Sequence, residues 1–169
     1  LLIEKKRGLG AGKINGPGGK IDPGESPLQC VIRETQEELL ITPLNPRKIG
    51  ELWFSMSDSP HILCHVFRAD DHIGAPTETD EAVPLWTSVE SIPYNQMWED
   101  DRHWLPLLLE ETHFHGRFIF KGESIAIAAR MALGRRPRSK VRIRVVGASS
   151  MGWTEAAEAW GAEVEAVVV

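Results

Sequence analysis

The 169 residues suit one globular domain with a short appendage, because 42% of them are hydrophobic and can build a sizeable core. The formal charge of −5 and the pI near 5.7 exclude a protein that coats long nucleic acid, which needs a basic face. An acidic chain can still bind a small nucleotide, since a cation held by carboxylates attracts phosphates.

The two cysteines, Cys30 and Cys64, lie in apolar surroundings without the spacing of a metal site. This usage is typical of reduced thiols in a cytoplasmic protein rather than of a disulfide framework. No apolar run reaches the ~18–20 residues of a membrane span. We therefore expect a cytoplasmic monomer without a membrane or nucleic-acid partner.

The first predicted elements are the end of a strand at residues 1–3, a glycine-rich loop at 8–19 and a helix at 26–39. Ser26 can cap this helix, Pro27 suits its first position, and Gln29 completes a capping box. The loop has unusual backbone freedom, and a simple linker is the alternative interpretation.

Strand-like stretches follow at residues 49–56 and 61–69, with shorter candidates at 84–87 and 114–120. Residues 100–110 are typical of a helix, in which Pro106 predicts an irregularity. This mixture predicts an α/β or α+β fold, with a mixed sheet sandwiched between helices.

The character of the chain changes near residue 133. We predict a catalytic domain at 1–132, a basic linker at 133–140 and a β-α-β-like tail at 141–169. The tail could begin a second domain. In the competing hypothesis, its apolar last strand replaces a sheet strand lacking before Leu1.

The most informative residues lie on the predicted helix at 26–39. Glu34, Glu37 and Glu38 share one face, where three like charges repel unless a divalent ion binds them. Oxygen ligands without histidine or cysteine favour magnesium or manganese over zinc. Arg33 lies four residues before Glu37 and could orient it. The alternative is an ordinary solvated acidic face.

Gly18 and Gly19 precede this helix, and their backbone groups can reach an ion or a phosphate that a side chain would block. The whole segment resembles the signature of the Nudix hydrolases: Gly19-x5-Glu25-x7-Arg33-Glu34-Thr35-Gln36-Glu37-Glu38-Leu39-Leu40-Ile41. Thr35 stands where an aliphatic residue is usual and Leu40 where glycine is usual, so we expect a less regular helix exit.

The resemblance extends beyond the signature. Residues 5–16, 97–109 and 114–116 are similar to the mammalian-type 8-oxo-dGTP diphosphatase branch of this family. The resemblance implies a Nudix fold and Mg²⁺-dependent hydrolysis of oxidised purine nucleoside triphosphates, such as 8-oxo-dGTP or 2-hydroxy-dATP, to monophosphate and pyrophosphate. Mn²⁺ is the expected substitute. Such an enzyme cleans the nucleotide pool and so prevents DNA damage.

The same resemblance implies a base pocket. It is formed by Asn15, Trp98, Asp100 and Asp101, with Lys5 and Leu9 also at the substrate. An indole can stack on a purine, and carboxyl and amide groups can read its polar edge. Leu9 stands where the mammalian relatives have an aromatic residue, which predicts a different pocket shape.

The expected catalytic groups are Glu34, Glu38, Glu81 and Arg33. Glu34 and Glu38 are the predicted principal metal ligands, Glu37 and the Gly18 carbonyl support them, and Glu81 serves as ligand or base. Two alternatives stay open: a Nudix hydrolase of another nucleoside diphosphate derivative, and a non-catalytic nucleotide-binding module.

Overall fold

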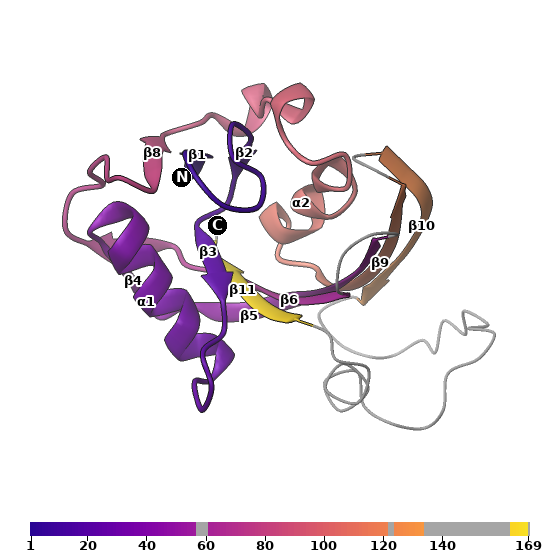
Figure 1. Cartoon of the computed structure of the whole chain (residues 1–169), viewed down its shortest axis with the longest axis horizontal. Coiled ribbons are helices and arrows are strands. Elements are labelled where there is room, and N and C mark those ends of the chain that lie inside the picture. The colour runs from indigo at the N-terminus through magenta and orange to yellow at the C-terminus, as the bar shows by residue number, and fades with distance from the viewer. Residues whose placement is uncertain (57–60, 122–123, 134–162, 169) are drawn as a thin grey trace.

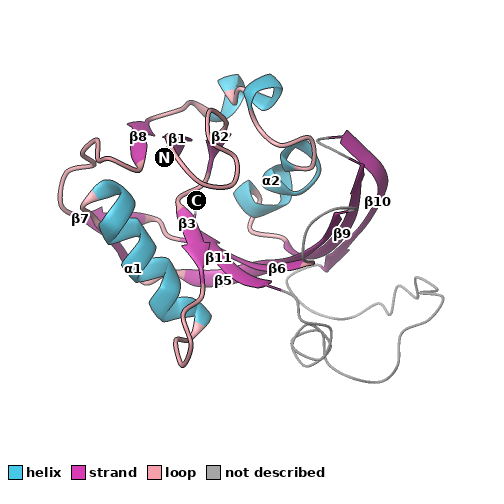
Figure 2. Ribbon diagram, in the orientation of Figure 1, coloured by secondary structure: helices cyan, strands magenta, loops and turns pink. Residues whose placement is uncertain are grey.

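A computed structural model describes residues 1–56, 61–121, 124–133 and 163–168. Figures 1 and 2 show its elements, which in chain order are β1 (Leu2–Lys5), β2 (Ile14–Asn15), β3 (Gly18–Lys20), α1 (Pro27–Leu39), β4 (Thr42–Leu44), β5 (Arg47–Met56), β6 (Ile62–Arg68), β7 (Asp71–Ile73), β8 (Ala82–Leu85), the 3-10 turns η1 (Val89–Ser91) and η2 (Tyr94–Gln96), α2 (Asp101–Leu109), β9 (His113–Lys121), β10 (Ser124–Leu133) and β11 (Glu163–Val168). No described helix has both the length and the apolar character needed to cross a membrane.

The described strands form three sheets. The largest has the order β10-β9-β5-β6-β11-β3, and the smaller ones are β2-β1-β8 and β4-β7. The large sheet is mixed, because β5 runs parallel to β9 and β6 runs parallel to β11, whereas its other neighbours are antiparallel. This confirms the predicted mixed α and β architecture.

The two helices pack on opposite faces of this sheet. Val66 of β6 belongs to the core cluster that contains Leu105 of α2, and the next residue, Phe67, packs with Val31 of α1. Successive residues of a strand point to opposite faces, so α1 and α2 enclose the sheet between them. The sandwich places the glycine-rich β3 beside α1 and the pocket beside α2.

Helix α1 begins as predicted. The Ser26 hydroxyl accepts from the Gln29 backbone N–H at 3.3 Å, while the Ser26 N–H donates to the Gln29 side chain at 2.9 Å. Thr35 is buried, and its hydroxyl donates to the Val31 carbonyl at 2.6 Å, which satisfies a polar group in an aliphatic position.

The expected irregular exit from α1 is wrong. Leu40 adopts the left-handed conformation with φ 58° and ψ 29°, and its N–H donates to the Gln36 carbonyl at 3.0 Å. The turn that glycine usually makes is therefore kept, at a backbone cost of roughly 1 kcal/mol. The apolar side chain remains exposed.

Strand β10 was not predicted, because Ser124–Leu133 contains alanine and other helix-forming residues. Its antiparallel pairing with β9 overrides that local preference. In the tail, the strand at 141–146 and the helix at 153–160 lie outside the described residues. The described strand β11 pairs with β6 and β3, and the division of the tail from the catalytic domain stays a prediction.

Candidate active site

Strand β3 packs directly on the carboxylates of α1. A β-carbon at Gly19 would lie 2.5 Å from the carboxyl carbon of Glu34, so no larger residue fits without displacing that carboxylate. The adjacent Gly18 N–H donates to Glu38 Oε2 at 2.8 Å. Gly18 and Gly19 therefore fix the positions of the Glu38 and Glu34 carboxylates, two of the three predicted acidic groups.

Glu38 is fully buried, and burial raises its pKa to about 7. The Gly18 N–H and the Lys5 ammonium oppose this shift, whereas the charges of Glu34 and Glu81 reinforce it. Lys5 Nζ lies 3.7 Å from Glu38 Oε1, and this oxygen has no hydrogen-bond donor among the described residues. A buried, unsatisfied carboxylate oxygen is costly unless a cation or donor binds it.

Arg33 is the centre of an acidic cluster. Its guanidinium donates to both oxygens of Glu25 at 2.9 Å, to Glu34 at 2.8 Å and to Glu37 at 3.0 Å. These hydrogen bonds hold the pKa of Glu25 at about 2. Arg33 therefore orients more groups than predicted, among them Glu37, which is half exposed.

The loop before β8 brings Glu81 to the end of α1. The Thr79 hydroxyl donates to the Glu38 carbonyl at 2.9 Å and accepts from the Glu81 N–H at 3.2 Å. The Glu81 carboxylate forms an ion pair with Arg7 and is one-third exposed. The predicted acidic residue from outside the signature thus lies close enough to shift the pKa of Glu38.

The acidic side chains have two features that a bound cation would stabilise. In the described part of the chain, no three acidic, histidine or cysteine side chains lie together so that they could hold a metal ion. Oε1 of Glu38 nevertheless has no hydrogen-bond donor among the described residues, and the negative charges of Glu34 and Glu81 lie near it, so an oxygen-binding divalent ion would relieve both. Gly18 contributes its N–H here, and the ligand role of its carbonyl stays a prediction.

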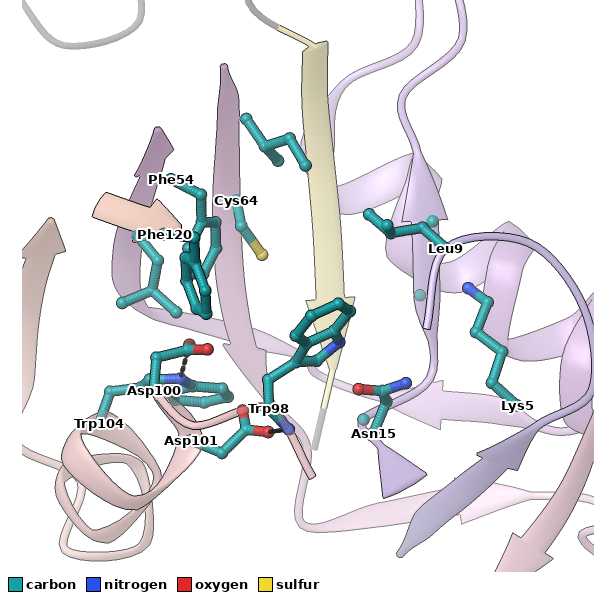
Figure 3. A pocket seen from close by; sticks show the side chains of 15 residues that line it. Lys5, Leu9, Asn15, Phe54, Cys64, Trp98, Asp100, Asp101, Trp104 and Phe120 are labelled. Atoms are coloured by element: carbon teal, nitrogen blue, oxygen red, sulfur yellow. Dashed lines mark hydrogen bonds between the residues drawn. The ribbon is translucent and has the colours of Figure 1, made fainter. Parts of the chain in front are cut away.

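A pocket lies over the large sheet, between the glycine-rich loop with β3 on one side and the start of α2 on the other (Figure 3). It is lined by Lys5, Leu9, Asn15, Gly16, Gly18, Gly19, Leu52, Phe54, Ile62, Cys64, Trp98, Asp100, Asp101, Trp104 and Phe120. All six predicted substrate-binding residues are therefore brought together. The two glycines link this pocket to the carboxylates of α1.

Two neighbouring aspartates are buried at one end of the pocket. Asp100 accepts from the Trp104 indole N–H at 2.9 Å, and Asp101 accepts from the Trp98 backbone N–H at 3.0 Å. Burial raises the pKa of both carboxyls, and the charge of Asp100 raises that of Asp101 further. Each carboxyl accepts one hydrogen bond that favours its ionised form, but the shared burial opposes ionisation of both together.

Trp98 is held from several sides. Lys13 Nζ lies 4.8 Å from its ring centroid, and Phe120 meets it edge-on at 6.1 Å. A β-carbon at Gly10 would lie 3.2 Å from both the Trp98 indole nitrogen and the Asn15 amide nitrogen. The glycine loop therefore packs closely against the predicted stacking platform. Leu9 is half exposed.

Sequence reasoning missed several pocket residues, namely Trp104 and the residues from β5, β6 and β9. Trp104 follows Asp100 by four positions, which on a helix brings the two together, so its role had a local signal. Phe54, Cys64 and Phe120 come from three strands that meet only in the sheet. The sequence predicted these strands but not that their side chains would line one pocket.

Known proteins share this architecture. The family model of the NUDIX domain matches residues 1–108. An oxidized purine nucleoside triphosphate hydrolase from Danio rerio is 43% identical over 128 residues, which cover 75% of this chain and 82% of the relative. The protein of the same name from Mus musculus is 39% identical over 129 residues, or 76% and 83% of the two chains.

A solved structure agrees with these sequence relatives. The crystal structure of the Mutator MutT protein from Bacillus halodurans superposes with a TM-score of 0.69 at 25% identity, covering 76% of this chain and 87% of that one. Nudix hydrolases generally use divalent metals, in keeping with the acidic cluster described above. The match over most of the chain confirms the resemblance seen in the signature, and the protein belongs to the Nudix family.

Proposed function

We propose that this chain hydrolyses oxidised purine nucleoside triphosphates to the monophosphate and pyrophosphate in a Mg²⁺-dependent reaction. The expected substrate is 8-oxo-dGTP, with 2-hydroxy-dATP as a second candidate. The observation that carries the proposal is that one pocket joins an aromatic platform and a buried aspartate pair to the glycines beside the acidic helix. The names of the two vertebrate relatives support the same substrate class.

The cation would be held by Glu34 and Glu38, with Glu37, Glu81 and the Gly18 carbonyl as supporting groups. When bound, Mg²⁺ or its substitute Mn²⁺ neutralises charge on the phosphate oxygens. Oε1 of Glu38 is buried and has no hydrogen-bond donor among the residues that the structure describes, which supports a role for Glu38 as a principal ligand. Glu37 is engaged with Arg33 and half exposed, which supports a secondary role.

The chain's own residues orient the reacting groups. Arg33 orients the Glu34 carboxylate, and the Gly18 N–H orients that of Glu38. Because both carboxylates are already in place, substrate binding does not incur the entropic cost of ordering them. Lys5, at the border of the pocket and the acidic cluster, supplies a positive charge for the phosphates. The candidate bases for the attacking water are Glu34, Glu38 and Glu81, and the pH profiles of their glutamine variants would separate them.

Base recognition rests on the aspartate pair. An ionised Asp100 accepts hydrogen bonds from the N–H groups of an oxidised guanine, while a protonated Asp101 donates to its carbonyl. Exchange of the proton within the pair would suit an oxidised adenine. Trp98 provides the stacking surface, and the Asn15 amide offers a donor and an acceptor at the same pocket.

We test substrate and activity together with a panel of nucleotides, measuring pyrophosphate release with and without Mg²⁺. The expected order of kcat/KM is 8-oxo-dGTP and 2-hydroxy-dATP above dGTP and dATP, with no release in the presence of a chelator. Faster turnover of nucleotide sugars, dinucleotides or capped RNA would assign another Nudix substrate. Tight nucleotide binding without turnover would instead identify a non-catalytic module.

Two substitutions probe the pocket itself. Asp100→Asn and Asp101→Asn should each change the ratio of kcat/KM for 8-oxo-dGTP over dGTP, because asparagine cannot exchange protonation states. Trp98→Ala is the matched control and should weaken both substrates by similar factors, since stacking tolerates any purine face. An unchanged ratio and unchanged rates in both Asp variants would mean that the base binds elsewhere.

We further propose that the protein works in the cytoplasm as a monomer. Cys30 and Cys64 are both buried, and neither forms a disulfide within the described residues, as is usual in a reducing compartment. Light scattering coupled to size-exclusion chromatography would check the mass against the 18.8 kDa of one chain.

A further inference from the structure

The last described strand lies inside the catalytic sheet rather than beside it. β11 runs parallel to β6 and antiparallel to β3, and Figure 1 shows it as the yellow ribbon next to β3. Ala166 is the midpoint of this arrangement, because it pairs with His65 on one side and with Gly19 on the other. A segment more than 140 positions away in sequence thus contacts the glycine strand of the active site.

Strand β3 depends on β11 for its place in the sheet. Among the described strands, β3 has β11 as its only neighbour in the large sheet, and each of its three residues has a partner there. Adjacent strands lie about 4.8 Å apart, so removing β11 would leave β3 and β6 separated by roughly 10 Å with unpaired backbone groups on both edges.

The active site tolerates little movement of β3. Gly18 donates to Glu38 at 2.8 Å, and Gly19 leaves no space for even a β-carbon against Glu34. A shift of β3 by about 1 Å would lengthen the Gly18–Glu38 hydrogen bond beyond the range of normal N–H···O distances. A misplacement of this size in an active site can lower the rate by about 10²-fold. β6, on the other side of β11, contributes Ile62 and Cys64 to the pocket.

We propose that β11 is a positioning strand of the active site, which holds the Gly18–Gly19 strand at a fixed distance from the pocket wall formed by β6. Figure 3 shows its pale ribbon passing behind the pocket beside the strand that carries Cys64. The structural part of this inference concerns the sheet alone. Its consequence for catalysis rests on the proposed function.

The test is a proline at the midpoint of β11 in the full-length chain. Ala166→Pro removes a backbone donor from a central strand, where proline is excluded, whereas Ala166→Ser keeps the donor and nearly the same size. Hydrogen exchange is measured by mass spectrometry for β3 and β6, with β5 and β9 as the internal reference.

For Ala166→Pro we expect amides of β3 and β6 to lose protection while the pairing of β5 with β9 keeps it, and kcat/KM to fall about 10²-fold. The serine variant should match the wild type in both measurements. Unchanged protection of β3 and β6 in the proline variant would overturn the inference. Lost protection with wild-type kcat/KM would overturn the positioning role.

A milder substitution in the full-length chain covers the case in which Ala166→Pro unfolds the whole domain. Ala166→Gly keeps the backbone donor but weakens the interior of a strand, so amides of β3 and β6 should exchange faster than in the wild type while those of β5 and β9 keep their protection. Wild-type exchange of β3 and β6 in the glycine variant would overturn the inference.

These outcomes are separable from the proposed function. Hydrogen exchange reports on the sheet whether or not any nucleotide is hydrolysed. A wild-type chain that releases no pyrophosphate from any nucleotide would refute the proposed activity and leave the exchange result to decide the role of β11.

Discussion

A single methyl group at Gly19 should separate catalysis from stability. In Gly19→Ala the new β-carbon would lie 2.5 Å from the carboxyl carbon of Glu34 and 2.5 to 2.6 Å from its oxygens, well inside van der Waals contact. The Gly19 backbone has no positive φ, so alanine meets no conformational penalty there. The side chain of Glu34 must therefore move.

The cost of that movement can be worked from the contacts of Glu34. Its carboxylate is held by Arg33 at 2.8 Å, a charge-assisted bond of a kind that contributes about 1.5–3 kcal/mol. Burial raises the pKa of this carboxyl, so moving it toward water recovers part of the loss. We expect a net loss of about 1 kcal/mol, or about 2–4 °C in Tm, and a loss of about 10²-fold in kcat/KM.

The matched control is Gly24→Ala. Gly24 has φ +85° and nothing within 4 Å of an added β-carbon, so alanine should cost roughly 1 kcal/mol of backbone strain without touching the site. Both variants should then melt at similar temperatures. Gly24→Ala should keep wild-type kcat/KM for 8-oxo-dGTP in a pyrophosphate-release assay.

The reasoning would be refuted by a Gly19→Ala enzyme whose kcat/KM stays within about twofold of wild type, because Glu34 would then have moved without effect on the reaction. Equal losses of activity in the two glycine variants would also contradict it. In that case general loosening of the loop, rather than displacement of Glu34, would explain the loss.

Glu38→Gln removes a charge from the cation site without changing the volume of the side chain. Turnover should therefore fall by at least about 10²-fold while the fold stays intact. A rate above about a tenth of wild type would argue against Glu38 as a principal ligand. Burial raises the pKa of Asp101, so the folded chain keeps a proton on this carboxyl that the unfolded chain releases above about pH 4. The free energy of unfolding should therefore fall as the pH rises from about 4 toward the pKa of Asp101 in the folded chain. Asp101→Asn should flatten this fall in thermal melts, and a slope equal to that of wild type would show that Asp101 is ionised in the folded chain. Leu40 has a left-handed backbone conformation and an exposed side chain, so Leu40→Gly should relieve backbone strain without losing buried contacts. Tm should rise by about 2–4 °C with activity unchanged. A lower Tm would show that the Leu40 side chain makes a stabilising contact.

Local sequence determined helix α1 and the acidic face it carries. The capping box at Ser26 and Gln29 fixes where the helix begins, and helical spacing fixes that Glu34 and Glu38 share a face. The signature around them was sufficient to identify the family. These features are local, because each depends on residues no more than a few positions apart.

The tertiary structure decided the environment of those residues. The burial of Glu38, its oxygen without a donor and the closeness of Glu81 all follow from how β3 and the loop before β8 pack on α1. The same holds for β11: its apolar residues allowed a place in the sheet as one hypothesis, but they did not indicate that Ala166 would pair with both Gly19 and His65. Strand pairing between distant segments is set by which edges remain open after the rest of the sheet has formed, and no local pattern of residues encodes that.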